Sequence, residues 1–218
     1  MDEARSIAET PTEPSGPPPA PEGYAEPYAF GYPRGVLLIG SMVLGMLSMA
    51  IFGGLLWLVQ GPEVFATAFE ATTENGATTF VLDVRAVALP FVVAIVGTTI
   101  LHELIHGAVF RWYGHDVSYG AVPSIGAFYA GAFGQFQTRE ALFRVGLAPL
   151  IVITAVCVPL LAVPIPAVAI TAVFVLTLNS AGAVGDLYLT WRLLRMPPET
   201  LMYDVDIHHS YVYESLEA

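Results

Sequence analysis

The sequence contains no lysine and few charged residues of any kind. Only 12% of its 218 residues are charged, about half the share that is usual in soluble domains, and 55% are hydrophobic. This composition indicates an integral membrane protein rather than a soluble one.

Basic residues are especially scarce. Eight arginines stand against nineteen acidic residues, and the formal net charge is −11. Nucleic-acid binding needs a basic face, so the composition excludes nucleic acid as a partner. An acidic exterior without lysine suits a high-salt cytoplasm, which supports the hypothesis of a halophilic source.

The sequence also lacks a disulfide framework and a recognisable secretory signal. Its one cysteine, Cys157, lies in an apolar run, and we interpret it as a packing residue. The first 26 residues contain acidic side chains where a signal peptide would have basic ones. We therefore expect no cleavage of the N-terminus.

Proline, glycine and glutamate dominate residues 1–33, and a continuous aliphatic run begins only near Val36. A segment of this kind buries too little apolar surface to order itself. We predict a disordered, Pro/Glu-rich cytoplasmic tail at 1–33, with binding to a partner protein as the alternative. A four-helix membrane domain is expected at 34–195, followed by an acidic cytoplasmic tail at 196–218.

Four apolar segments are candidates for membrane crossing, and they cover residues 35–59, 86–112, 145–163 and 166–191. A helix needs about 20 apolar residues to cross the hydrocarbon core. The predicted fold class is therefore an all-α integral membrane protein with about four transmembrane helices. Pro164 leaves only a short turn between the last two segments, so these two helices should form an antiparallel pair.

The arginines predict how the bundle is oriented. Six of them fall at the same side of the four segments: Arg34, Arg111, Arg139, Arg144, Arg192 and Arg195. The opposite side has the acidic stretch 60–85, in which Arg85 is the only basic residue. Arginine collects in cytoplasmic loops, so we expect a multi-pass protein of the cell membrane with both termini in the cytoplasm.

The second apolar segment contains the sequence "HELIH". On a helix, His102 and His106 project from one face and can bind a single metal ion. In the H-E-x-x-H arrangement the glutamate, here Glu103, is the general base that takes a proton from water. Val109 and Trp112 stand where a metzincin would have glycine and histidine, so that class is excluded. The alternative is a pair of buried histidines that bond to neighbouring polar groups.

A catalytic zinc ion needs a third protein ligand. Asp186 is the only carboxylate in the third and fourth apolar segments. At a rise of about 1.5 Å per residue, Asp186 and His106 lie some 7 to 9 Å from the arginines that end their helices. The two residues should therefore reach one depth on one side of the bundle, and Asp186 is the predicted third ligand. A buried aspartate that bonds a hydroxyl or caps a helix is the alternative.

Asn179 lies two helical turns before Asp186 and should share its face. Its amide is predicted to contact the substrate or the developing oxyanion, with an interhelical hydrogen bond as the alternative. Two further pairs, His115 with Asp116 and His208 with His209, are weaker metal candidates because they fall outside the apolar segments.

The motifs "HELIHG", "APL" and "NSAGAVGDL" together resemble the zincin peptidases of the membrane, a family distantly similar to the site-2 intramembrane metalloproteases. The resemblance covers about residues 86–195. It implies that His102, His106 and Asp186 are zinc ligands and that Glu103 is catalytic. The chain has Leu187 where the site-2 pattern has glycine.

Residues 114–138 are rich in glycine and aromatic side chains. We predict a loop at the membrane interface between the second and third helices, with its aromatic residues in an interfacial belt. The resemblance to site-2 proteases offers an alternative, in which short strands of this loop pair with an unwound substrate.

The sequence thus predicts a zinc-dependent, membrane-embedded metallopeptidase with one Zn²⁺ ion. Its substrates would be membrane or juxtamembrane proteins and peptides, and its other partner is the lipid bilayer. The alternative is a metal-binding membrane protein without catalytic activity, such as a divalent-cation carrier or a sensor subunit.

Overall fold

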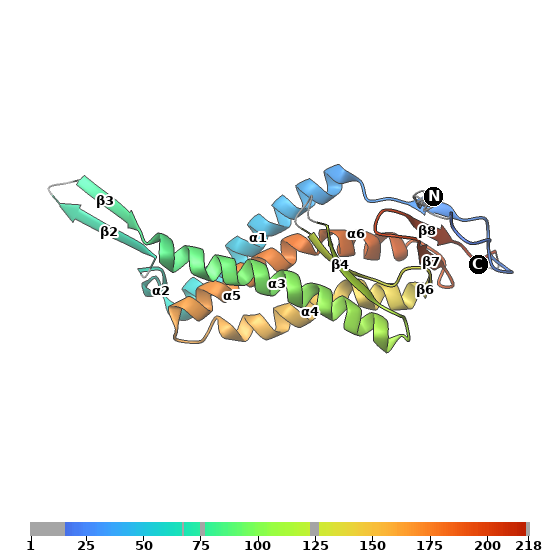
Figure 1. Ribbon diagram of the computed structural model, residues 1–218. Coiled ribbons are helices and arrows are strands. Elements are labelled where there is room, and N and C mark those ends of the chain that lie inside the picture. Colours follow the sequence, from blue (N-terminus) through green and yellow to red (C-terminus); the bar gives the residue numbers. More distant parts are fainter. Residues whose placement is uncertain (1–15, 67, 75–76, 123–126, 217–218) are drawn as a thin grey trace, which may run out of the picture.

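The computed structural model describes residues 16–66, 68–74, 77–122 and 127–216. Figure 1 shows an elongated bundle of helices with a small β-sheet and both marked chain ends at one end. A β-hairpin projects from the opposite end (Figure 1). We refer to these as the sheet end and the hairpin end.

Three helices are long and apolar enough to cross a membrane: α1 (Arg34–Gln60), α3 (Val84–Trp112) and α4 (Arg139–Leu160). A further pair, α5 (Pro166–Gly182) and α6 (Val184–Leu193), meets the same test only when taken together. The two are bent by 43° at their junction. The fourth segment was expected to be one continuous helix, and the structure corrects this expectation.

Local sequence explains where the helices begin. The carboxylate of Asp83 accepts hydrogen bonds from the backbone N–H groups of Arg85 and Ala86 and so caps α3. Thr138 caps α4 in the same way through Ala141. Pro166 stands at the first turn of α5, where its missing N–H costs no hydrogen bond.

Helix α5 lies at the centre of the bundle and contacts α1, α3 and α4. One hydrophobic cluster, which includes Leu56, Ile153 and Leu176, joins these helices toward the hairpin end. A second cluster, which includes Phe110, Leu142 and Leu193, joins the helices to the sheet. The outer surfaces of α1 and α3 expose many large apolar side chains, as expected for helices in contact with lipid.

The sheet at the sheet end has four antiparallel strands in the order β1-β8-β7-β6. Its strands are β1 (Tyr28–Phe30), β6 (Phe136–Thr138), β7 (Leu201–Asp204) and β8 (Ser210–Tyr213). The fold is therefore not purely helical. Residues 28–30 were expected to be disordered and instead pair with β8, while residues 1–15 of the predicted tail lie outside the described residues. The segment 196–218 likewise contributes β7 and β8 rather than a simple tail.

Two hairpins complete the fold. The short helix α2 (Glu63–Ala66) leads into β2 (Phe69–Glu74) and β3 (Ala77–Leu82), which form the projecting hairpin. The strands β4 (Ser118–Val122) and β5 (Ala127–Gly131) form a second hairpin in the region predicted as an interfacial loop. Both of its strands contact α3, and β5 does so most extensively.

Candidate metal centre

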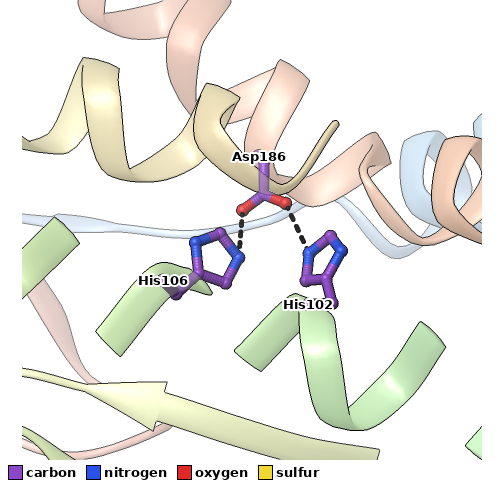
Figure 2. Close-up of side chains that lie close together, drawn as sticks. All are labelled: His102, His106 and Asp186. Atoms are coloured by element: carbon purple, nitrogen blue, oxygen red, sulfur yellow. Dashed lines mark hydrogen bonds and ion pairs between the residues drawn. The ribbon is translucent and has the colours of Figure 1, made fainter. Parts of the chain in front are cut away.

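The structure brings together the three residues that the sequence analysis selected as metal ligands. His102 and His106 lie one turn apart on α3, with ring centroids separated by 4.7 Å. Nε2 of His102 lies 3.2 Å from Oδ2 of Asp186, and Nε2 of His106 lies 3.6 Å from Oδ1. Figure 2 shows the carboxylate between the two imidazole rings. The candidate ligand atoms all lie within 4.8 Å of one another.

The other ring nitrogen of each histidine has its own partner. Nδ1 of His106 lies 2.9 Å from the carbonyl oxygen of Val145, and Nδ1 of His102 lies 3.1 Å from Oδ1 of Asn179. The amide nitrogen of Asn179 donates to the carbonyl of Pro149 at 3.4 Å, which is consistent with its oxygen facing His102. Both oxygens only accept hydrogen bonds, so each Nδ1 carries the proton. Each Nε2 faces Asp186 and is the ring nitrogen available to a metal ion.

This arrangement fits a zinc ion. Two imidazoles and one carboxylate form the type of three-ligand set that leaves a fourth position open for water. Metal-ligating histidines usually donate their second N–H to a carbonyl or a carboxylate, as His102 and His106 do here. The cluster is also poorly hydrated, because the side chains of His102 and His106 are only 12% and 10% exposed.

The bend between α5 and α6 positions Asp186. The second helix begins at Val184, so Asp186 lies in its first turn. Gly146 of α4 packs against this turn, and a Cβ added there would lie 3.6 Å from the carbonyl oxygen of Asp186. Gly146 therefore lies where α4 packs against α6, and its neighbour Val145 reaches His106. Sequence reasoning did not identify Val145 or Gly146.

Glu103 faces the β4–β5 hairpin. Its Oε2 accepts a hydrogen bond from the backbone N–H of Ala130 in β5, with 2.7 Å between nitrogen and oxygen. Glu103 and His102 also line the same cavity, so the glutamate is next to the metal centre without belonging to the ligand cluster. The position of Ala130 was not predicted, because the hydrogen bond uses a backbone group that every residue but proline possesses.

Asn179 lies inside the bundle and is completely buried. Its amide bonds His102 and Pro149, which corresponds to the interhelical hydrogen bonding that the sequence analysis named as the alternative. The weaker metal candidates do not join the centre. His209 bonds Asp206 at the surface, and within the described ranges His102, His106 and Asp186 form the only such group of three.

Comparison with known families agrees with the chemistry of this centre. Residues 95–201 match a family model described as "Putative zincin peptidase". The zincin peptidase segment contains all three candidate ligands together with Glu103, Ala130, Val145 and Asn179. Helix α1 and strands β1 and β8 lie outside it. No curated protein and no solved structure matches the chain.

Proposed function

We propose that this protein is a zinc-dependent, membrane-embedded metallopeptidase that hydrolyses peptide bonds of membrane or juxtamembrane substrates. The observation that supports the proposal best is the convergence of His102, His106 and Asp186, with Glu103 next to them. Membership of the zincin peptidase family supports zinc as the metal and peptide hydrolysis as the reaction.

Each polar residue has a role in this proposal. His102, His106 and Asp186 would hold one zinc ion, which would supply Lewis acidity toward a water molecule and the scissile carbonyl. Glu103 takes a proton from the water as its oxygen attacks the carbonyl carbon. Glu103 then gives that proton to the leaving nitrogen as the C–N bond breaks.

Asn179 and Val145 act on the ligands rather than on the substrate. By accepting from Nδ1, their oxygens select the tautomer in which Nε2 binds the metal. In this proposal Asn179 is a positioning residue, in place of the oxyanion or substrate contact that the sequence suggested.

The β4–β5 hairpin is the proposed substrate-binding element. A peptide bond inside a helix is inaccessible, so a membrane substrate has to be extended before it is cut. Strand β5 lies next to Glu103, and an extended peptide can add to a strand edge through main-chain hydrogen bonds. This position favours a substrate role for the hairpin over a purely interfacial one.

The proposed location is the cell membrane, with the sheet end and both termini in the cytoplasm. The six arginines that the sequence analysis grouped all lie in or just beyond the helix ends at the sheet end. Arg85 lies at the other end, as do Glu63 and Asp83. This asymmetry agrees with the excess of arginine on cytoplasmic sides of membrane proteins.

A non-catalytic metal carrier is less well supported. A carrier needs polar groups at several depths along a path, whereas the candidate ligands within the described ranges form one cluster at one depth. The proton-transfer role assigned to Glu103 would also have no purpose in a protein that only holds the metal.

The test combines metal analysis with a cleavage assay on the purified full chain. We expect about one zinc per wild-type chain, and we expect His102→Ala and Asp186→Ala to lose it. Glu103→Gln should keep the zinc and lose the cleavage of membrane peptides. His115→Ala is the matched control because it removes a histidine just beyond α3 and outside the cluster, and it should keep both.

Three results would contradict the proposal. A wild-type chain without metal under chelator-free conditions would overturn the metal centre. An Asp186→Ala variant that retains its zinc would remove Asp186 from the ligand set. A Glu103→Gln variant that cleaves as fast as wild type would overturn the assigned proton transfer.

A further inference from the structure

Two cavities lie near the candidate metal centre, and their linings differ in chemistry. The first shares His102 and Glu103 with the site, and the second begins at Phe110, one helical turn beyond His106. We propose that they select peptides with a large apolar side chain on one side of the scissile bond and a cationic side chain on the other. This inference rests on the proposed peptidase function and specifies the substrate class of the same site.

The first cavity lies next to the metal centre, toward the hairpin end of the bundle, and has a volume of about 270 Å³. His102 and Glu103 form one end of it. The remaining wall comes from the preceding turns of α3, from Phe128 of β5, and from Leu178 and Gly182 of α5. We call it the apolar cavity.

The wall of the apolar cavity offers few polar groups to a substrate. The hydroxyl of Thr99 already donates to the backbone carbonyl of Ile95 in its own helix, at 2.8 Å. The neighbouring Thr98 is only 6% exposed. An apolar cavity of about 150 Å³ is enough to hold benzene, so this one has room for an aromatic or a long aliphatic side chain.

The second cavity lies on the sheet side of the centre and has a volume of about 260 Å³. Phe110, one turn beyond His106, forms part of its wall, and Tyr129 of β5 forms another part. Two carboxylates, those of Asp204 and Asp206, also line it. None of its lining residues within the described ranges is basic. We call it the acidic cavity.

The carboxyl group of Asp204 has no cationic partner among the described residues. Its Oδ2 accepts a hydrogen bond from Nε2 of Gln137 at 3.1 Å, which is a neutral donor. Burial raises the pKa of the Asp204 carboxyl because it removes water from the charged form. A cationic side chain in the cavity would restore the lost stabilisation, and the rings of Tyr32 and Tyr129 would add favourable faces for it.

Strand β5 connects the two cavities. Phe128 lines the apolar cavity and the next residue, Tyr129, lines the acidic one. The following residue, Ala130, holds Glu103. Along α3, Thr99 and Phe110 are separated by about 16 Å, which an extended peptide covers in about five residues. A peptide next to β5 can therefore place one side chain in each cavity with its scissile bond near Glu103.

The test uses the zinc-loaded full chain and a set of synthetic membrane peptides. Each peptide carries phenylalanine or alanine at one position and arginine or glutamine at another, with the two positions varied within about four residues of the cut. Mass spectrometry of the products gives the cut site, and initial rates give kcat/KM. Wild type should prefer the peptide with both phenylalanine and arginine, on opposite sides of the cut, by at least about tenfold over the peptide with neither.

Two variants probe the cavities separately. Asp204→Asn should reduce the preference for arginine over glutamine by about tenfold. Gly182→Leu fills the apolar cavity, where an added Cβ meets no atom within 4 Å, and should reduce the preference for phenylalanine over alanine by about tenfold. The matched controls are Asp116→Asn, an exposed carboxylate outside both cavities, and Gly97→Leu, a glycine of α3 with equally open space. Both controls should keep the wild-type preferences.

The outcomes separate this inference from the proposed function. If the zinc-loaded wild type cleaves no peptide, the peptidase proposal is overturned and the inference with it. If cleavage occurs and is abolished by Glu103→Gln, but wild type shows neither preference, only the inference is overturned. Retention of the arginine preference in Asp204→Asn, or of the phenylalanine preference in Gly182→Leu, would likewise overturn it.

Discussion

Oδ1 of Asn179 lies 3.1 Å from Nδ1 of His102, although 77 residues separate the two in the chain. The contact links α5 to α3 inside the bundle, where Asn179 is completely buried. It connects the packing of the central helix to the orientation of a candidate metal ligand. Substitutions at this contact should therefore change metal binding.

We expect Asn179→Ala to weaken zinc binding by about 10- to 100-fold, because His102 loses the acceptor that fixes its tautomer and ring orientation. Competition with a chromogenic chelator measures the affinity. Ser180→Ala is the control, since this neighbouring buried hydroxyl bonds only its own helix, at the carbonyl of Leu176. Equal zinc affinity in Asn179→Ala and wild type would show that Asn179 does not position the ligand.

Gly107, next to His106, provides the close approach of the β4–β5 hairpin to α3. The hydroxyl and ring of Tyr119 pack directly against this glycine, and a Cβ added there would lie 2.9 Å from Cε1 of the ring. Gly107→Ala should therefore displace the ring of Tyr119 from its position against α3, at a cost of about 1 kcal/mol. We expect kcat/KM to fall while zinc content stays near the wild-type value.

The effect of Gly107→Ala should depend on Tyr119. In a Tyr119→Ala background the clash is absent, so the added methyl group should have a smaller effect on kcat/KM and on the unfolding temperature. Gly97→Ala, in open space on the same helix, is the control. Simple additivity of the Gly107 and Tyr119 substitutions would contradict the proposed contact.

Gln60 connects the end of α1 to the turn between α4 and α5. Its amide nitrogen donates to the carbonyls of Leu161 at 2.6 Å and of Val163 at 2.8 Å. Gln60→Ala leaves these carbonyls with fewer donors and should lower the free energy of unfolding by about 1–3 kcal/mol. Thermal unfolding in detergent measures the loss.

Zinc content should be unaffected by Gln60→Ala, since the substitution lies at the hairpin end. The control is Thr171→Ala, which removes a hydrogen bond within α5 only, to the carbonyl of Ala167. The control should change stability by less than about 0.5 kcal/mol. Equal effects of the two substitutions would indicate that the link between helices contributes nothing specific.

The stability of the sheet end should depend on pH through Asp204. Burial raises the pKa of this carboxyl in the folded chain. The protonated Asp204 carboxyl therefore favours the folded chain. This stabilisation is fully present below the unfolded pKa of about 3.9 and is lost as the pH rises through the folded pKa. Asp204→Asn removes this loss, so the variant should gain in unfolding temperature relative to wild type between about pH 4 and neutral pH.

Asp206 should show the opposite trend, and it serves as the comparison. The hydrogen bond with His209 lowers the pKa of the Asp206 carboxyl. Its contribution is therefore present above the unfolded pKa and lost as the pH falls. Asp206→Asn should lose unfolding temperature relative to wild type as the pH rises from about 4. The same pH trend in both variants would contradict the two assigned environments.

The side-chain part of the candidate site could be predicted from the sequence. The spacing of His102 and His106 predicts that they share a helix face. The distance in residues between Asp186 and the arginine that ends its helix predicts the same depth in the bundle as that of His106. These inferences succeed because the regular rise of a helix converts sequence number into position.

The backbone part of the site could not be predicted. The carbonyl of Val145 and the N–H of Ala130 belong to groups that nearly every residue has, so no residue type signals their roles. The bend before Val184 was missed for a related reason. Gly182 and Gly185 lie on either side of this bend, and the sequence alone does not distinguish small residues for close helix packing from a break between two helices.

The small sheet was missed because its strands are short. β1 has three residues within a proline-rich segment, and the average composition of that segment indicates disorder. β8 has the aromatic and β-branched residues typical of a strand, but only over four positions. Strands of this length form because the other strands and the helix ends supply partners, and a single segment does not contain that information.

The pairing of β1 with β8 has a consequence for the order of events during synthesis. Tyr28 pairs with Val212, so the first strand has no partner until β8 has left the ribosome. All the helices are complete by then, since α6 ends at Leu193. Closure of the sheet is therefore a late step of biogenesis, and a truncated chain that ends before residue 210 would leave β1 without its neighbour even though it contains the whole metal centre.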